Sequence, residues 1–204
     1  MKIVIATNNK HKRDELLAVL REELASNVQI ITLDEIEPPI GEIEEPGSTL
    51  EENAIIKARV VFDRTGLPTV ADDTGLEVQA LNGAPGVYSA RYAGQDATYN
   101  SNIDKLLGEL APHEDRTSRF RTVIAFIDAK GNEYLFDGEV RGSILSGRKG
   151  DRGFGYDPVF SPTEDSSGRS FAEMTSEEKN RISHRGRALR KLTEHLKNSV
   201  LKAA

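Results

Sequence analysis

The sequence predicts an α/β protein with a mixed β-sheet and flanking helices. Short apolar, β-branched segments alternate with amphipathic segments in the first half of the chain. Two longer strand-like segments, separated by a turn sequence, follow in the second half. No repeat, low-complexity tract or linker interrupts the 204 residues, so we expect a single domain over residues 1–204.

The first elements should be two buried strands with a helix between them. Residues 2–6 and 28–32 are apolar and β-branched, which is typical of buried strands. A helix is expected from His11 to Leu24, because leucines recur along one stripe of that segment. The acidic segment 34–47 is rich in proline and glycine, which indicates a loop.

A capping signal starts the next helix. Ser48 or Thr49 can cap it, and a glutamate three residues on completes a capping box. Gly66 suits the left-handed residue that ends a helix. Further along, we expect strands at 67–71 and 76–81, a helix at 98–110, and hairpin strands at 119–127 and 134–145.

The last part of the chain should be helical. Thr175 and Glu178 form a capping box, and a second helix follows Ser183 with leucines facing the core. The loop from Gly147 to Ser170 is long for a compact domain, which favours a functional role for it.

Composition excludes several classes of function. The chain has no cysteine, which excludes disulfides, thiolate catalysis and cysteine-ligated metals. Its net charge of -6 disfavours nucleic-acid binding. No apolar run is long enough to cross a bilayer, and the first apolar stretch is too short for a signal peptide. We therefore expect a cytoplasmic protein that binds neither nucleic acid nor membrane.

A basic turn separates the first strand from the first helix. The N-terminus of a helix normally prefers acidic neighbours, and a bound phosphate would explain cations there. The alternative is an exposed basic turn without function. The turn consists of Thr7, Asn8, Asn9, Lys10, His11, Lys12 and Arg13.

Two adjacent carboxylates, Asp72 and Asp73, follow an apolar strand. The carboxyl ends of strands are where α/β proteins bind ligands, and in strand geometry the two side chains point to opposite sides. One of them could hold Mg²⁺ or orient a water. Taken alone, the segment is better explained as a turn, since Asp, Thr and Gly are ordinary turn residues.

Two later segments also carry candidate chemistry. In Gly150–Pro158, glycines allow close approach of the backbone to a ligand, and Phe154 and Tyr156 offer faces on which a base can stack. No Walker P-loop motif occurs in the chain. The segment Lys179–Arg185 is basic and includes His184; a solvated helix face is the alternative there.

In this order the segments resemble the inosine triphosphate pyrophosphatase family, whose members hydrolyse non-standard purine nucleoside triphosphates. Each motif is weak by itself, but seven in series are specific, and they extend over nearly the whole chain. Thr74 stands where many members have serine, and Asn8 where glycine is common. The matching segments are Thr7-x-Asn9-x-x-Lys12, Glu44–Gly47, Glu52–Ala58, Ala71–Gly75, Gly83–Tyr92, Gly153–Pro158 and Ala172–Gly186.

The resemblance implies a long mixed sheet whose flanking helices form two lobes around a central cleft, Mg²⁺ as cofactor, and a homodimer. It implies that Asp73 is the general base and, with Glu45, a metal ligand; Glu44 is the alternative to Glu45. Lys57 is expected to assist at the phosphates. The implied substrate-binding residues are Thr7, Asn8, Asn9, Lys10, His11 and Lys12 for the phosphates, and Thr74, Phe154, Gly155, Tyr156, Asp157, Lys179, His184 and Arg185 for the rest of the nucleotide.

The expected reaction converts dITP, ITP or XTP to the monophosphate and pyrophosphate, which would cleanse the nucleotide pool. A water activated by Asp73 attacks the α-phosphorus, and cations stabilise the leaving pyrophosphate. Donors such as His184 or Arg185 would accept a 6-keto purine and reject a 6-amino one. Two alternatives are a Maf-like pyrophosphatase of pyrimidine or modified nucleotides, and a nucleotide sensor without turnover. The serine-rich opening turn of Maf-like proteins is absent.

Overall fold

The computed structural model describes residues 1–24 and 28–200. In this part of the chain, seven strands pair in the order β2-β1-β3-β5-β6-β7, with β4 paired to β3. β1 is parallel to β2 and β3, whereas the β3–β4 and β6–β7 pairs are antiparallel. The predicted α/β fold with a mixed sheet is therefore confirmed. The strands are β1 (Lys2–Ile5), β2 (Gln29–Thr32), β3 (Thr69–Val78), β4 (Pro85–Gly86), β5 (Thr117–Ile127), β6 (Glu133–Ile144) and β7 (Phe160–Pro162).

Helices flank the sheet, and nearly all predicted elements lie within two residues of observed ones. None of the helices in the described ranges is long and apolar enough to span a membrane. The helices are α1 (Lys10–Glu23), α2 (Leu50–Thr65), α3 (Tyr99–Leu110), α4 (Ser176–Ile182) and α5 (His184–His195), with 3-10 turns at Leu33–Glu35, Gln79–Leu81, Ser89–Arg91, Asp157–Val159 and Phe171–Glu173, and a π-helical segment at Leu196–Val200.

The chain divides into two compact units, and β3, β5 and β6 contribute residues to both. Unit 1 comprises Met1–Asp73, Thr122–Gly138 and Arg185–Ala204, and unit 2 comprises Thr74–Arg121 and Glu139–His184.

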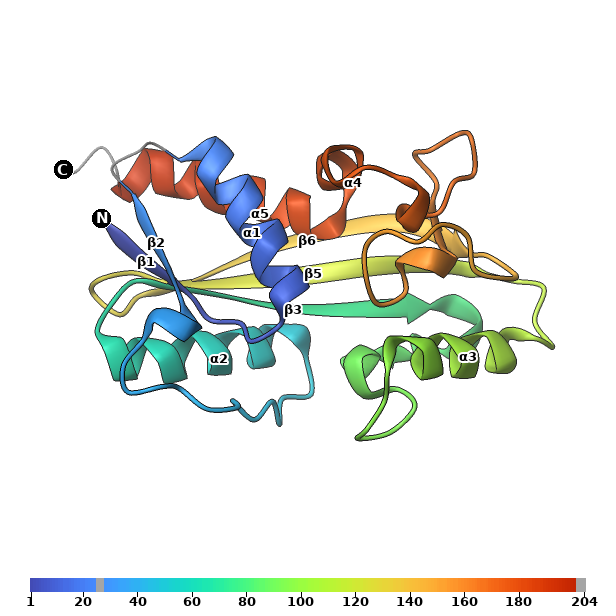
Figure 1. Cartoon of the computed structure of the whole chain (residues 1–204), viewed down its shortest axis with the longest axis horizontal. Helices are drawn as coiled ribbons and strands as arrows, with labels where there is room; N and C mark the ends of the chain where they lie inside the picture. Colours follow the sequence, from blue (N-terminus) through green and yellow to red (C-terminus); the bar gives the residue numbers. More distant parts are fainter. Residues whose placement is uncertain (25–27, 201–204) are drawn as a thin grey trace. The chain divides into compact units, whose positions relative to one another are not determined.

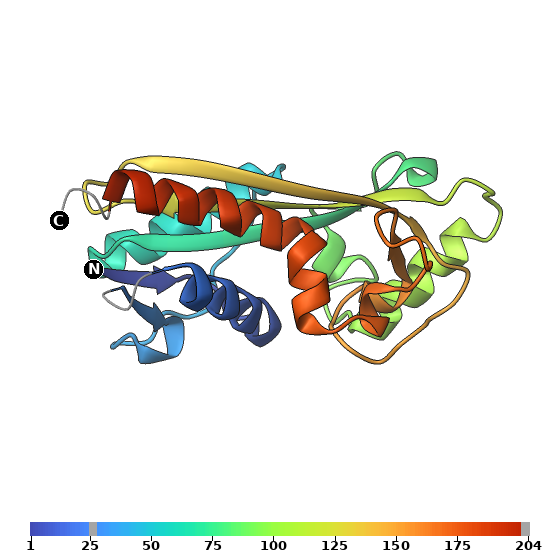
Figure 2. The same cartoon turned by 90° about the horizontal axis from the view of Figure 1, so that it is seen from above.

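Unit 1 packs helices against both faces of its strands. In Figures 1 and 2, α1 and α5 lie together on one face, and α2 lies on the other. The contacts agree, because leucines of α1 and α5 share one buried cluster with Ile3 and Ile5 of β1 and Phe126 of β5. The buried positions of α2 include Ala54, Ala58 and Val61.

The capping signals around α2 act largely as predicted. The Thr49 side chain accepts a hydrogen bond from the Glu52 backbone N–H, and the Glu52 carboxylate accepts from the backbone N–H and hydroxyl of Ser48. Gly66 ends the helix at a φ of 65°, a conformation that glycine adopts without steric cost. The entry to α2 is thus well defined, and it follows directly on the acidic segment that carries Glu45.

Unit 2 has a separate aromatic core. Phe120 of β5, Phe160 of β7 and Phe171 pack together, with ring centroids 4.7 to 6.4 Å apart. α3 contributes buried residues to the same cluster. Strand β7 lies within the segment predicted to be a long loop; it pairs with β6 at Gly142, where a side chain would collide with Ser161 and Phe160. A strand of three residues is too short to show an alternation of apolar and polar residues, so the sequence did not indicate it.

One prediction about β3 is wrong. The two strands expected at 67–71 and 76–81 are a single strand that continues through Asp72, Asp73 and Gly75. Cations from other elements neutralise the two carboxylates. The carboxylates can therefore lie inside a buried strand and need not be exposed in a turn. Gly75 lets β4 approach, because a Cβ on it would lie 2.7 Å from the Gly86 carbonyl oxygen. The interpretation of this segment as a turn is therefore replaced by a strand interior.

The close contact at Gly75 can be tested with a pair of alanine substitutions. Gly75→Ala should lower the free energy of unfolding by about 1–3 kcal/mol, because the new methyl group meets the backbone of β4. Gly108→Ala in α3 is the control; nothing lies within 4 Å of its Cβ position, and alanine should stabilise that helix by up to about 1 kcal/mol. Urea denaturation of both variants measures this, and equal effects would contradict the packing argument.

Candidate active site

Charged side chains gather in unit 1 where the chain leaves β1 and runs beside β3. The Ala6 N–H donates to the Val70 carbonyl at 2.7 Å, so the turn after β1 lies next to the part of β3 that leads into Asp72 and Asp73. Asn9 caps α1 by accepting from the backbone N–H groups of His11 and Lys12 at 3.0 and 3.2 Å. The exposed residues of this turn are Asn8, Lys10 and His11, and the half-buried ones are Thr7, Asn9 and Lys12.

Asp72 is the centre of the first cluster. Its carboxylate lies 3.2 Å from Lys12 Nζ and 3.3 Å from Arg185 Nε. The Arg185 guanidinium also pairs with Glu15 of α1. The side chains of Asp72 and Arg185 are 0% and 2% exposed, whereas Lys12 is 17% exposed. The buried Asp72 and the partly buried Glu15 thus face two cations, and a buried charge needs such pairing.

The pKa of Asp72 follows from these contacts. Burial alone would raise the pKa, but Lys12 and Arg185 outweigh burial and hold the pKa of Asp72 below its ordinary value. Burial lowers the pKa of Lys12 more than Asp72 raises it. Asp72 is consequently a permanent carboxylate at neutral pH, suited to positioning Lys12 and unsuited to accepting a proton.

Asp73 is the centre of the second cluster and faces a different set of partners, as strand geometry predicts. Lys57 Nζ donates to Asp73 Oδ1 at 3.0 Å and to Glu45 Oε2 at 2.8 Å. Asn53, one turn before Lys57 on α2, lies with its Nδ2 3.4 Å from Asp73 Oδ2. Asn53 Oδ1 accepts from the Gly47 N–H at 2.7 Å, which ties the acidic segment to α2.

The pKa of Asp73 moves in the opposite direction to that of its neighbour. Burial is the largest cause and raises it; Lys57 and Lys12 lower it, Glu45 raises it again, and the net pKa lies above the ordinary value. For Lys57, burial lowers the pKa, but Asp73 and the other carboxylates raise it further, so the ammonium form persists. A carboxylate with a raised pKa is the better proton acceptor of the two.

The acidic pair Glu45 and Asp73 fits a Mg²⁺ ion that is shared with a substrate. Mg²⁺ prefers oxygen ligands and is usually held by one or two carboxylates together with substrate phosphates. Within residues 1–24 and 28–200, no group of three or more Asp, Glu, His or Cys side chains is arranged to hold a metal by itself. Glu45 rather than Glu44 makes the contact to Lys57, while Glu44 lines a groove with residues 39–43.

Unit 2 gathers the second group of candidate residues. Asp157 Oδ2 accepts from Lys179 Nζ at 2.6 Å and from the Phe154 N–H at 2.9 Å. Lys179 Nζ also lies 4.9 Å from the centre of the half-buried Phe154 ring. Gly153, at a φ of 71°, must be glycine here because a Cβ would collide with the Asp157 carboxylate. Gly155 adopts a φ of 60°.

Tyr156 departs from its expected role. Its ring is buried in the core of unit 2, and its hydroxyl donates to the Ser89 carbonyl at 2.9 Å. A ring in that position offers no free face to a base, so the stacking role expected of Tyr156 is wrong, and Phe154 is the aromatic residue left for it.

His184 and Arg185 are consecutive but lie in different units. The His184 ring is buried and stacks on Phe120, with centroids 4.6 Å apart. The Arg185 guanidinium points to Asp72 instead. Arg185 therefore anchors the cluster of unit 1 in this structure, which differs from its expected role as a donor to the nucleotide. Thr74 directly follows Asp73 in β3 and is half-buried.

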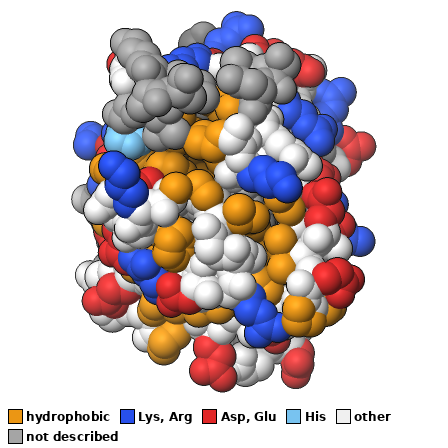
Figure 3. Space-filling model, turned by 90° about the vertical axis from the view of Figure 1, so that its left-hand side faces the viewer, with side chains coloured by type: hydrophobic (Ala, Val, Ile, Leu, Met, Phe, Trp, Pro, Cys, Tyr) orange, Lys and Arg blue, Asp and Glu red, His pale blue; other side chains and the backbone are white. Residues whose placement is uncertain are grey.

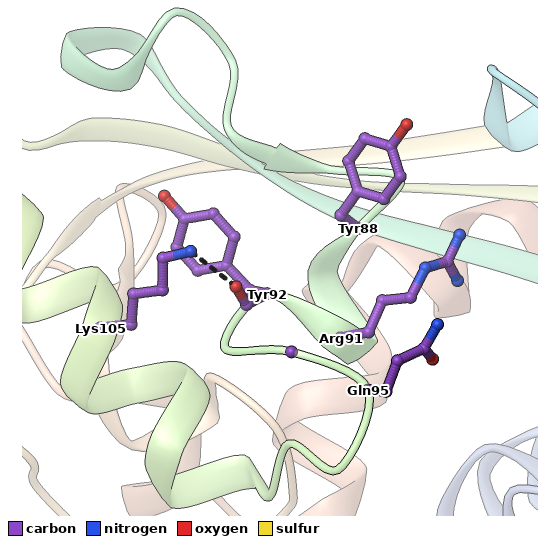
Figure 4. A pocket seen from close by; sticks show the side chains of 6 residues that line it. Tyr88, Arg91, Tyr92, Gln95 and Lys105 are labelled. Atoms are coloured by element: carbon purple, nitrogen blue, oxygen red, sulfur yellow. Dashed lines mark hydrogen bonds between the residues drawn. The ribbon is translucent and has the colours of Figure 1, made fainter.

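A second concavity lies in unit 2, apart from these residues. Figure 4 shows Tyr88, Arg91, Tyr92, Gln95 and Lys105 around a cavity of about 420 Å³. Lys105 Nζ donates to the Tyr92 carbonyl at 2.8 Å and lies 4.3 Å from the centre of the Tyr92 ring. None of the predicted site residues lines this cavity. On the surface drawn in Figure 3, acidic and basic side chains are interspersed among hydrophobic ones.

A model of the Ham1 family matches residues 3–195. The chain belongs to the Ham1 family. Relatives of this Ham1-family protein include a dITP/XTP pyrophosphatase of Christiangramia forsetii, 48% identical over 96% of this chain and 99% of the relative. A dITP/XTP pyrophosphatase of Geobacter sulfurreducens is 47% identical over 96% of both chains.

Solved structures show the same relationship. The Ham1 protein of Coxiella burnetii matches with a TM-score of 0.86 and 41% identity, over 98% of this chain and 100% of that chain. The Staphylococcus aureus Ham1 protein matches with a TM-score of 0.84 and 38% identity, over 97% and 98%. Both likenesses extend through the two units of this Ham1-family protein.

Two contributors to the clusters were not singled out from the sequence. Glu15 pairs with Arg185, and Asn53 joins Asp73 to the acidic segment. Spacing gave a signal for both, because Glu15 lies three residues after Lys12 and Asn53 four residues before Lys57, which places each pair on one helix face. This spacing is only weak evidence, because it does not indicate which part of the protein packs against that helix face.

The depressed pKa of Asp72 predicts how its contribution depends on pH. Asp72→Asn should cost about 3–5 kcal/mol of stability at neutral pH, because the buried Arg185 and the partly buried Lys12 lose their shared carboxylate. A carboxylate with a depressed pKa stabilises above its ordinary value of 3.8 and loses that contribution as pH falls through the lower folded value. The difference between the two proteins should therefore be constant above about pH 5 and shrink below about pH 4.

Urea denaturation between pH 3 and pH 8 measures this difference. Asp104→Asn is the matched control: its ion pair with Arg148 is 2.7 Å long but its side chain is 67% exposed. The control should change stability by less than about 1 kcal/mol at every pH. A difference for Asp72→Asn that grows on acidification would contradict the assignment.

Proposed function

We propose that this Ham1-family protein is a Mg²⁺-dependent nucleoside triphosphate pyrophosphatase that converts dITP, ITP and XTP to the monophosphate and pyrophosphate. The observation that carries the proposal is the paired arrangement in unit 1, where Glu45 and Asp73 share Lys57 while Lys12 is held beside them by Asp72. An acidic pair for a metal next to lysines for phosphates is what hydrolysis of a metal-bound triphosphate requires. The names of the relatives support the substrate class.

Asp73 is proposed as the general base. It takes a proton from a water, which attacks the α-phosphorus, and the bond between the α-phosphorus and the bridging oxygen breaks as pyrophosphate leaves. Mg²⁺, held by Glu45 and Asp73, would supply charge neutralisation at the phosphate oxygens. Lys12 stabilises the negative charge that collects on the leaving group. The Asn9-capped start of α1 lies in the same turn and presents backbone N–H groups to phosphate oxygens.

Unit 2 is proposed to bind the base. Phe154 provides a ring for stacking, and Lys179 and Asp157 form a fixed donor–acceptor pair beside it. A 6-keto purine accepts hydrogen bonds at the position where adenine donates them, so donors at this site favour hypoxanthine and xanthine over adenine. A cytoplasmic homodimer is proposed on the family resemblance.

A panel of nucleotides tests the proposal. We expect release of pyrophosphate from ITP, dITP and XTP at least about a hundredfold faster, as kcat/KM, than from ATP, because a site built to hydrogen-bond one polar group rejects its opposite strongly. EDTA should abolish the reaction and Mg²⁺ should restore it. Preference for dUTP or TTP would favour the Maf-like alternative, and tight binding without pyrophosphate release would favour a sensor.

The role of Asp73 is tested by Asp73→Asn, which removes the proton acceptor and one metal ligand while keeping the shape of the side chain. We expect kcat for ITP to fall by about 10²–10⁴-fold. Asp63→Asn, on the exposed side of α2, is the matched control and should leave kcat unchanged. Near-normal turnover by Asp73→Asn, in protein with a cooperative unfolding transition, would remove Asp73 from the mechanism.

A further inference from the structure

We propose that the Lys57 ammonium occupies the place of the divalent cation between Glu45 and Asp73, so that Mg²⁺ loading is a cation exchange that releases Lys57 to the triphosphate. The inference rests on the proposed function and adds a step to it. The metal site is then filled by a side chain of the protein before the metal arrives.

The geometry carries the first part of the inference. A single nitrogen, Lys57 Nζ, contacts one oxygen of each carboxylate, at 2.8 Å for Glu45 and 3.0 Å for Asp73. Lys57 and Asp73 are buried, whereas the Glu45 side chain is 31% exposed. The ammonium therefore joins a buried carboxylate on β3 to a partly exposed one on the acidic segment.

The contacts of the two Asp73 oxygens explain why the Lys57 ammonium and Mg²⁺ would compete for one position. Asp73 Oδ2 faces Asn53 Nδ2 at 3.4 Å, and Asn53 is itself held by the Gly47 N–H. The other oxygen of Asp73, Oδ1, accepts from Lys57 Nζ, which also donates to Glu45. A metal ion held by both carboxylates would compete with Lys57 for these oxygens.

Charge supports exchange over joint occupancy. Two carboxylates and one ammonium leave a net charge of -1, and a divalent ion added beside the ammonium would put three positive charges on two negative ones at a partly buried site. Displacement of Lys57 avoids this repulsion. Lys57 stands on a rigid helix with a long, flexible side chain, so the released ammonium stays close and can meet phosphate oxygens of the incoming nucleotide.

Binding of Mg²⁺ alone, without nucleotide, tests the exchange. Lys57→Met keeps the length of the side chain and removes the competing charge, so Mg²⁺ should bind about tenfold more tightly than to the unmodified protein in isothermal titration calorimetry. Lys12→Met is the matched control, since Lys12 contacts Asp72 and not the acidic pair. It removes the same charge from the same unit.

The exchange requires that the gain for Lys57→Met exceed the gain for Lys12→Met by about fivefold or more. Equal gains would assign the effect to net charge, and an unchanged or weaker affinity in Lys57→Met would mean that Lys57 does not hold the metal position. Either result overturns the proposal.

A measurement on the unmodified protein covers the case in which Lys57→Met does not fold. Acetylation of lysines, followed by mass spectrometry, should modify Lys57 several-fold faster with Mg²⁺ than without it, while the exposed Lys105 keeps its rate. An unchanged Lys57 rate at saturating Mg²⁺ overturns the exchange. Both experiments omit nucleotide, so their outcome is independent of whether ITP and XTP prove to be substrates.

Discussion

Two adjacent carboxylates buried in the middle of one strand set the main constraint on unit 1. A buried carboxylate is costly unless a cation or several donors pair with it. Asp72 takes its cations, Lys12 and Arg185, from α1 and α5, and Asp73 takes Lys57 from α2. The two carboxylates of β3 point to opposite sides and both need a cation. This requirement explains why α1, α5 and α2 each direct a basic side chain toward β3.

The same constraint separates the two carboxylates by function. Asp72 has two cations and a pKa below its ordinary value, so it remains a fixed anion that orients a lysine. Asp73 shares one cation with Glu45, and burial keeps its pKa above the ordinary value. Alternation along a strand is enough to place neighbouring identical side chains in environments that shift their pKa values in opposite directions.

The sequence predicts helix ends correctly where the interactions that form them involve only neighbouring residues. The cap at Thr49, the end of α2 at Gly66 and the capping box at Thr175 each depend on residues within one turn of helix. The prediction of a turn at Asp72–Gly75 was wrong, because residues typical of a turn also suit a strand whose carboxylates are neutralised by cations of other elements. The prediction that a base stacks on Tyr156 was wrong, because an aromatic ring beside glycines can either stack on a ligand or pack in a hydrophobic core.

The sequence by itself determined the α/β class, the helices with their caps, and the order of motifs that places the chain in the Ham1 family. Only the tertiary structure decided that Glu45 rather than Glu44 meets Lys57, and that Arg185 turns to Asp72. The reason is separation along the chain. Arg185 and Asp72 are 113 residues apart, and no short-range pattern records which charges become neighbours when the sheet and its helices pack.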